Sequence, residues 1–580
     1  MPATLDLAER AELALRAMVG LADPAAEHEV FWWAHLYAQP PRMSHNGDYF
    51  ILAEFMEAVP LLRTMTGNRD GEEVDRAWAA LVLKSIGPDG LLYVSNEGRP
   101  WEPGAGVVRR GNPWTCGRMM GAMTALYLRS GKDAMWGDAL KKMTDRLAEL
   151  VVEKDDYAYF PSYGFSPDAK RLEGVPQQGL SATYTAWALQ GLAQFYRASG
   201  YEPAGRLARR LALFLKDHAD IYDAKGRYLY SQQELDGLKA WKHEPQTNPE
   251  RLGGHHHHHS IGVLAIADYA AAVGDKELLS WAAASYEWAR DHESASKTVG
   301  FFAEYLQRDY PSAETCEIAD MLGLAVKLSA AGAGGYWDDV DRYLRNQFVE
   351  NQLTRHDWLE RLPAAMREAD APPTPGESRD RVSERNVGTF SGWATANEWT
   401  RVGQLMHCCV GNAGRALYYV WEHCVTHSDG ILRVNLLLNR ASPWADVQSH
   451  IPFAGKVEIT VKSSLKELLI RAPEWLRSGS EEAACSVNGG VRPLLWQGRY
   501  FGVGEVKAGD VVAITFPIAE RVVRERIGGL DCTLIIKGST VVKMEPSGTL
   551  NPLYQREHYR QNETLWVRKR LFIADSVLEW

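Results

Sequence analysis

The sequence predicts a mainly helical (α/α)6 toroid followed by a C-terminal β-sandwich region. Amphipathic helices recur in pairs along most of the 580 residues. Glycine-containing stops separate these pairs at intervals of about 60 to 75 residues, which is typical of a structural repeat. After residue 428 the pattern changes to two-residue alternation, which is typical of strands. We therefore expect a toroidal domain over residues 1–428 and one or two small β-domains over residues 429–580.

Helical spacing of apolar residues defines the repeats, and each first helix ends at a small or glycine-rich stop. Long return loops at residues 155–178 and 222–254 favour hairpins that close into a ring, with an open solenoid as the alternative. In a closed ring the inner helices frame one central pocket. The first helices are expected at 49–65, 119–128, 184–196, 261–272 and 321–328, and the second helices at 136–151, 203–215 and 276–288.

The β-region is recognised from short apolar runs separated by turn residues. Asn488-Gly489-Gly490 is a turn signal, and Lys507-Ala508-Gly509-Asp510 is another. Between such turns, strands are expected at 432–438, 457–461, 468–471, 484–487, 511–516 and 530–544.

Composition excludes several classes of protein. The formal net charge of −10 is spread without long runs, so the concentrated Lys and Arg of nucleic-acid binding are missing. No apolar stretch reaches membrane-spanning length, and the N-terminus lacks the pattern of a signal peptide. The seven cysteines are too few for a disulfide framework, which favours a cytoplasmic location. The oligomeric state is not predicted.

Two short motifs offer metal ligands. Glu314 and Cys316 precede one apolar helix, and Cys408 and Cys409 precede another. Zinc (Zn²⁺) accepts thiolate sulfur and carboxylate oxygen in a tetrahedral shell, and helix N-termini favour thiolates. Two motifs with two ligands each would complete one site. A vicinal cysteine pair is not a standard zinc knuckle, and the spacing alone favours buried structural cysteines.

Two further features contain titratable side chains. Five consecutive histidines at 255–259 begin a helix, and His255 or His256 shares a face with His259. One or two of these imidazoles point into the central pocket to bind substrate, or the run is an exposed polar helix start. Glu304 lies among aromatic residues, and burial would raise its pKa as a general acid requires. The residues alone do not single it out.

These motifs together resemble glycoside hydrolase family 127 and its relative family 146, the β-L-arabinofuranosidase-type enzymes. Glu314-x-Cys316 followed by Cys408-Cys409 is similar to the family's metal site, and Cys408-Cys409-Val410-Gly411-Asn412 stands where the family has Cys-Cys-Pro-Pro-Asn. The segment 429–436, the histidine run and the motifs at 473–475 and 487–489 also resemble the family. The resemblance covers roughly residues 180 to 520.

The resemblance implies both a fold and a set of roles. The family has an (α/α)6 toroid with β-sandwich domains, and its zinc is held by the residues that match Glu314, Cys316, Cys408 and Cys409. Cys408 matches the nucleophile. Glu304 matches the general acid and base. The implied reaction is retaining hydrolysis at the end of a glycoside or oligosaccharide, with a cysteine nucleophile.

The flanking residues depart from the family pattern. Met406 stands where the family has an extra cysteine, and Val410-Gly411 replaces Pro-Pro. Where the family has a substrate-binding histidine, this chain has Arg118 or Trp187. We therefore expect the family's metal-binding and catalytic residues, surrounded by different residues where the sugar binds. The family's arabinofuranose specificity is thus less firmly expected than its reaction type.

Three functions compete at this point. The first is a zinc-dependent retaining exo-glycosidase acting on a β-L-arabinofuranoside or a related glycan end. The second is a metal-independent polysaccharide lyase or sugar epimerase on the same toroid, which would use Tyr and His. The third is a glycan-binding protein in which zinc only holds the fold together. Zinc content and the effect of losing Cys408 discriminate between them.

Overall fold

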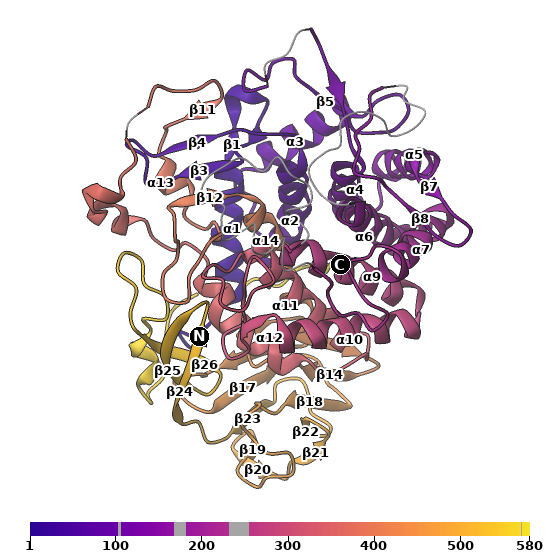
Figure 1. Cartoon of the computed structure of the whole chain (residues 1–580). Helices are drawn as coiled ribbons and strands as arrows, with labels where there is room; N and C mark the ends of the chain where they lie inside the picture. The colour runs from indigo at the N-terminus through magenta and orange to yellow at the C-terminus, as the bar shows by residue number, and fades with distance from the viewer. Residues whose placement is uncertain (103–105, 168–180, 231–253, 370, 570) are drawn as a thin grey trace.

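A ring of helices forms the larger part of the molecule (Figure 1). The computed structural model describes residues 1–102, 106–167, 181–230, 254–369, 371–569 and 571–580. Each inner helix packs against the next, and the last packs against the first, so the ring is closed. The predicted toroid is confirmed, and the open solenoid is excluded. The inner helices are α2 (Phe50–Thr66), α4 (Pro113–Arg129), α6 (Ser181–Ser199), α9 (His256–Val273), α11 (Thr315–Ala330) and α14 (Cys408–His423).

Inner and outer helices differ in burial, as a two-layered ring requires. In α2 every residue from Phe50 to Met65 is buried, because neighbours cover it on all sides. An outer helix such as α5 buries only one face. The outer layer comprises α1 (Leu7–Gly20), α3 (Glu72–Ser85), α5 (Ala134–Leu150), α7 (Glu202–Asp217), α10 (Lys276–His292) and α12 (Trp337–Tyr343).

Glycines end several of these helices where the chain must turn. Gly67 and Gly274 adopt φ values of 65° and 70° at the C-caps of α2 and α9, a left-handed conformation that glycine tolerates best. After the helix expected at 321–328, the sequence pattern predicts a stop at Gly334-Gly335. That position is wrong, since α11 ends at Ala330 and the positive φ belongs to Gly332. Each inner helix except α14 is followed by an outer helix that returns along the ring, and α1 packs against α2 and α14, so the inner N-termini share one end of the ring.

The C-terminal region contains the predicted sandwich, which lies below the ring in Figure 1. Alternate residues of β17 are buried, which confirms the two-residue pattern. One sheet has the order β13 (Val425–Ser428), β14 (Ile431–Val434), β18 (Glu467–Arg471), β22 (Tyr500–Gly502), β21 (Leu495–Gln497). The other has the order β15 (Arg440–Ala441), β16 (Ala445–Ser449), β17 (Lys456–Val461), β23 (Val511–Thr515), β19 (Ala484–Val487), β20 (Gly490–Arg492).

A third sheet and the following chain return to the ring. Strands β24 (Glu520–Ile527), β25 (Leu530–Lys537) and β26 (Thr540–Glu545) form this sheet. Glu525 accepts a hydrogen bond of 2.8 Å from Ser296 of the helical part. Near the C-terminus, the Leu578 carbonyl accepts one from the Tyr418 hydroxyl in α14. The predicted division of domains at residue 428 stays a prediction.

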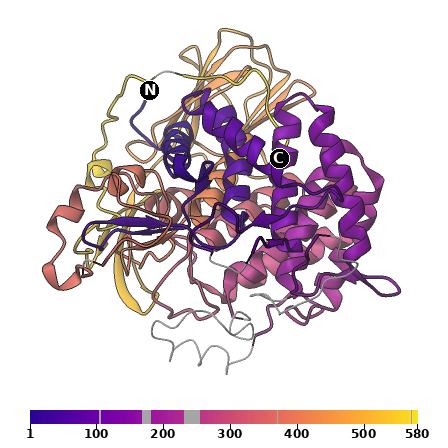
Figure 2. The ribbon, with the colours of Figure 1, turned by 90° about the horizontal axis from the view of Figure 1, so that it is seen from above.

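A small sheet inside the helical region was not predicted. It has the order β11 (Glu377–Ser378), β4 (Arg42–Ser44), β3 (Trp33–His35), β12 (Gln404–Met406). Figure 2, the view from above, shows these early and late segments crossing the same side of the ring. Of the expected long loops, residues 168–178 and 231–253 lie outside the described residues. Among the described helices, none is long and apolar enough to cross a membrane.

Candidate metal and catalytic site

The two predicted ligand motifs lie at neighbouring helix N-termini. Glu314 is the N-cap of α11, and its backbone N–H donates to the Glu317 side chain at 2.7 Å in a capping box. Cys316 lies in the first turn of that helix. Cys408 and Cys409 begin α14, directly after β12. Because α11 packs against α14, the two motifs meet.

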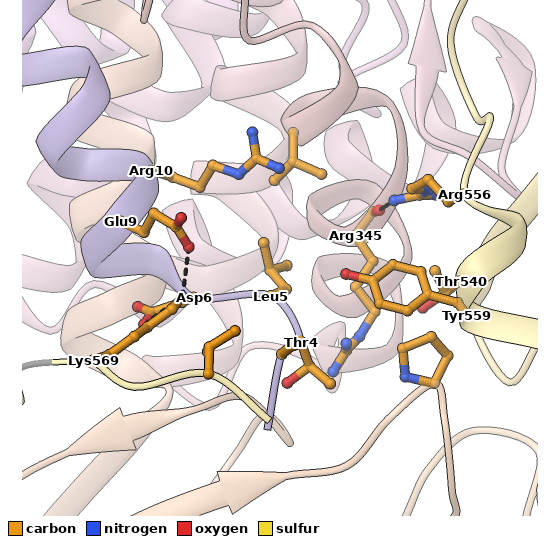
Figure 3. A pocket seen from close by; sticks show the side chains of 14 residues that line it. Thr4, Leu5, Asp6, Glu9, Arg10, Arg345, Thr540, Arg556, Tyr559 and Lys569 are labelled. Carbon is orange, nitrogen blue, oxygen red and sulfur yellow. Dashed lines mark hydrogen bonds and ion pairs between the residues drawn. The ribbon is translucent and has the colours of Figure 1, made fainter. Parts of the chain in front are cut away.

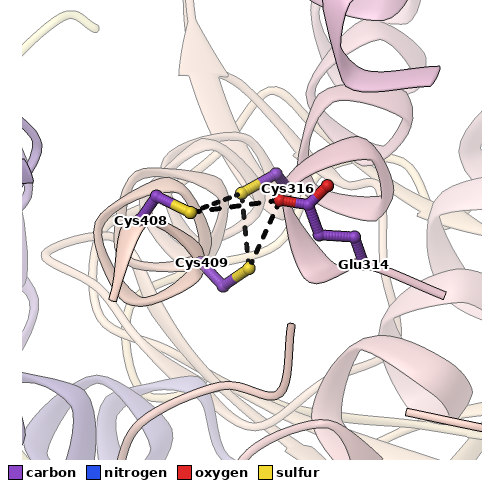
Figure 4. Close-up of side chains that lie close together, drawn as sticks. All are labelled: Glu314, Cys316, Cys408 and Cys409. Atoms are coloured by element: carbon purple, nitrogen blue, oxygen red, sulfur yellow. Dashed lines mark hydrogen bonds between the residues drawn. The ribbon is translucent and has the colours of Figure 1, made fainter. Parts of the chain in front are cut away.

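The four side chains converge on one point, as Figure 4 shows. Cys316 Sγ lies 3.4 Å from Cys409 Sγ and 3.8 Å from Cys408 Sγ. Glu314 Oε1 lies 3.7 Å from Cys409 Sγ and 3.9 Å from Cys408 Sγ. A tetrahedral zinc with Zn–S bonds of about 2.3 Å would separate its sulfur ligands by about 3.8 Å. The cluster therefore has the size and the donor set of a zinc site. All three cysteines are free of disulfide bonds, so their sulfurs could bind a metal.

The three cysteine residues differ slightly in exposure. Cys316 and Cys409 are fully buried, whereas Cys408 keeps 6% of its surface exposed. Burial raises the pKa of the Cys316 and Cys409 thiols well above the ordinary value, and for Cys408 the hydrogen bond with Cys316 is the largest cause. A metal bound here must displace thiol protons, which is the usual coupling between metal binding and pH.

Neighbouring side chains fix the cluster from two directions. His255 Nε2 lies 2.7 Å from Glu314 Oε2, which leaves Glu314 Oε1 facing the sulfurs. The buried Asn412 amide donates to Cys316 Sγ at 3.2 Å and to Glu54 Oε1 at 3.2 Å. Such partners orient metal ligands and stabilise thiolate charge.

Glu304 lies beside the cluster, within 4.8 Å of the nearest ligand atoms of His255 and Glu314. Only 8% of Glu304 is exposed. Burial, followed by the charge of Glu314, raises the pKa of Glu304 to about 7, while a hydrogen bond from Trp393 opposes this rise. A carboxyl group with such a pKa can give and take a proton near neutral pH.

The histidine run points in several directions because it begins a helix. His255 faces Glu314, and His257 Nδ1 lies 2.7 Å from Asp320 Oδ2. His258 lies 4.5 Å from the His255 ring and 5.8 Å from Trp114, measured between ring centroids. His256 is fully buried against Tyr228 and Phe302, where burial lowers its pKa to about 3. Substrate binding by His255 and His256 stays a prediction.

Arg118 and Trp187 lie together in the buried layer of the ring. Arg118 forms an ion pair with Glu57, and its guanidinium carbon lies 4.7 Å from the centre of the Trp187 ring. Trp187 is fully buried, with its ring 5.7 Å from that of His257. The structure thus connects both residues to the histidine run. Their predicted contact with substrate stays a prediction.

Asp320 was not predicted from the sequence, yet it connects the histidine run to Arg415. Besides His257, it accepts hydrogen bonds from Ser260 at 2.7 Å and from Arg415 at 3.1 Å. Asp320 lies four residues after Cys316 on the same helix face, so the spacing carried a signal. Asp320 thus fixes the orientation of the His257 ring through Nδ1.

Replacing Asp320 with Ala is expected to destabilise the fold strongly. The substitution leaves the Arg415 charge buried without its carboxylate, which typically costs about 3–5 kcal/mol. The urea midpoint measures the effect. Glu12→Ala, which removes an exposed partner of Arg16, is the control and should change stability by less than about 1 kcal/mol. Equal midpoints for the two variants would contradict this account.

One described cavity lies away from this cluster. It has a volume of about 260 Å³ and is bordered by the N-terminal segment, α1, β26 and residues 567–569 (Figure 3). Arg10, Arg345, Arg556 and Lys569 line it, and the last three are paired with carboxylates. None of the cluster residues borders this cavity. It belongs to the junction between the ring and the β-region.

Comparisons with known proteins give a result at the level of structure. No protein-family model matches the sequence, and no curated protein matches it. A GH127 β-L-arabinofuranosidase from Geobacillus stearothermophilus T6 is similar in structure at 16% identity, with a TM-score of 0.52 over 92% of this chain and 80% of that one. A second GH127 β-arabinofuranosidase has 15% identity and a TM-score of 0.56 over 92% and 80%.

A third structure, described as a glycoside hydrolase, has 15% identity and a TM-score of 0.53 over 90% of this chain and 84% of that one. This chain has the GH127 fold. The resemblance seen in the sequence is therefore confirmed for the fold.

Proposed function

We propose that the protein is a zinc-dependent retaining exo-glycosidase with Cys408 as nucleophile and Glu304 as general acid and base. One observation carries this proposal: a cluster of one glutamate and three cysteines, with the geometry of a zinc site, lies beside a separate buried carboxyl group that titrates near pH 7. We assign the nucleophile to Cys408 because it is the cysteine of the three that keeps some exposed residue surface.

Glu314, Cys316, Cys408 and Cys409 would hold the zinc, which when bound keeps the sulfurs as thiolates near neutral pH. In the first step, the Cys408 thiolate attacks the anomeric carbon. The glycosidic C–O bond breaks, and its electron pair leaves with the oxygen, which takes the proton of Glu304. The product is a thioglycoside on Cys408 and a free leaving-group alcohol.

In the second step, the Glu304 carboxylate takes a proton from a water molecule. The water oxygen forms a bond to the anomeric carbon, and the C–S bond breaks with its electron pair returning to Cys408. Two displacements retain the anomeric configuration. His255 maintains the orientation of Glu314 throughout, because it occupies the second carboxylate oxygen.

β-L-Arabinofuranosides are the proposed substrates, since two structures of this fold are described as GH127 β-arabinofuranosidases. A panel of aryl glycosides, furanosides first, tests the proposal on reduced, zinc-loaded enzyme. We expect release of the aryl group from a furanoside by the wild type. Absence of bound zinc, together with activity that survives Cys408→Ala, would favour a lyase or epimerase instead. Zinc binding without any hydrolysis would favour a glycan-binding protein.

The pH dependence should follow Glu304. Because the first step requires the protonated acid, and burial raises the pKa of Glu304 to about 7, kcat/KM is expected to fall as the pH rises above about 7. A pH profile with an alkyl glycoside measures this limb. Glu304→Gln has no such group to titrate and should lose the limb. An unchanged limb in that variant would assign it to another residue.

A further inference from the structure

Two tryptophans from distant parts of the chain lie parallel to each other. The rings of Trp33 and Trp393 are 6.2 Å apart between centroids, at an interplanar angle of 4°. Both side chains are partly exposed, unlike the fully buried Trp358 and Trp399 of the neighbouring core. Each of the two therefore keeps some surface that the protein core does not cover.

Strand pairing places Trp33 next to the nucleophile. In the antiparallel pair of β3 and β12, Trp33 is directly opposite Met406. Ala34 and Leu405, the next pair, are buried on the other face of the sheet, so Trp33 and Met406 share the partly exposed face. Cys408 follows two residues later, with its Sγ 4.0 Å from the Met406 carbonyl oxygen.

The segment that carries Trp393 also lies beside the cluster. A Cβ at Gly392 would lie 3.7 Å from Cys409 Sγ, so this segment packs against that sulfur. Ala394 pairs with Ala313, the residue before Glu314. The Trp393 side chain also hydrogen-bonds to Glu304. The stacked pair thus reaches the proposed acid Glu304 through Trp393, and it belongs to the β3–β12 sheet through Trp33.

A general acid must lie next to the oxygen of the leaving group. Because the Trp393 ring is hydrogen-bonded to Glu304, it lies on the leaving-group side of the glycosidic bond. We propose that Trp33 and Trp393 form the leaving-group subsite, and that it selects glycosides whose leaving group contains a ring. Flat indole faces pack on the C–H face of a sugar ring or on an aryl ring, whereas a methyl group covers little of them. This inference rests on the proposed function.

The test compares methyl, 4-nitrophenyl and disaccharide glycosides of the same terminal sugar. Trp33→Ala is expected to raise the KM of the two ring-bearing substrates, relative to that of the methyl glycoside, by roughly three- to tenfold. Trp33→Phe should restore most of the difference. If only the aryl glycoside responds, the subsite takes aromatic groups; if the disaccharide responds as well, it takes sugars. Trp566→Ala, an exposed tryptophan of the C-terminal segment, is the matched control.

If the wild type hydrolyses these glycosides but Trp33→Ala leaves the ratio of the ring-bearing KM to the methyl KM unchanged, the proposed subsite is wrong. The proposed function would stand. Zinc content and thermal midpoint separate a folding defect from a binding defect, because a merely structural tryptophan would alter both and leave the KM ratio constant. A wild type that hydrolyses none of the glycosides would overturn the proposed function, and the subsite with it.

Discussion

Cys408→Ser enzyme is expected to retain zinc but to lose glycoside hydrolysis by about 10³-fold or more, as nucleophile replacements do. A serine hydroxyl stays protonated near neutral pH and leaves poorly from the anomeric carbon. Glu314, Cys316 and Cys409 still offer three ligands. Turnover of an aryl furanoside and the zinc-to-protein ratio measure the two effects separately.

Cys485→Ser is the matched control for this experiment. Cys485 is also a buried free cysteine, but it belongs to β19 of the sandwich. We expect that variant to keep both zinc and activity. Cys409→Ser also leaves three ligands and should retain zinc as Cys408→Ser does, but it should keep more activity because the Cys408 thiolate stays in place. Full activity in Cys408→Ser would disprove the role of this residue as nucleophile.

Glu304→Gln is expected to lower the hydrolysis of alkyl glycosides by about 10²- to 10⁴-fold, the usual contribution of a positioned acid or base. Aryl glycosides should behave differently, because a nitrophenolate leaves without a proton. The variant should release a burst of nitrophenol and then turn over slowly, since it lacks the base for the second step. Rapid-mixing absorbance measurements detect the burst.

Glu525→Gln is a suitable comparison, because burial also raises the pKa of Glu525 but its partners are Ser296 and Thr298 at the third sheet. It should show wild-type kinetics. Equal loss of alkyl and aryl turnover in Glu304→Gln, without a burst, would mean that Glu304 serves binding or folding rather than proton transfer.

Much of the toroid could be predicted because its signals are local. Gly67 and Gly274 end their helices in the left-handed conformation, which favours glycine. The spacing of apolar residues identifies the helices before them. The β3–β12 pairing could not be predicted in the same way. Its strands have three residues each, and Trp33 meets Met406 only because the ring closes. Short strands with distant partners carry no periodic pattern.

The cluster shows the same contrast. The ligand motifs were recognisable because each supplies two donors at a helix start. Asn412 lies four residues after Cys408 on the same helix, so its position near the sulfurs could also have been read from the spacing. The surroundings of each histidine could not be predicted. Five consecutive residues point around the whole helix, because it turns by about 100° per residue, and the sequence does not say what lies on each side. Only the packed ring determines that His257 meets Asp320 and His256 meets Tyr228.

The central claim is a covalent sugar on Cys408, and mass spectrometry of the Glu304→Gln enzyme tests it most directly. The variant is mixed with an aryl β-L-arabinofuranoside, quenched during the burst and digested. We predict that the peptide containing Cys408 gains the mass of one pentosyl unit, and that Cys408→Ser in the same background abolishes this gain. A burst that leaves the sugar on another residue, or on none, would contradict the account.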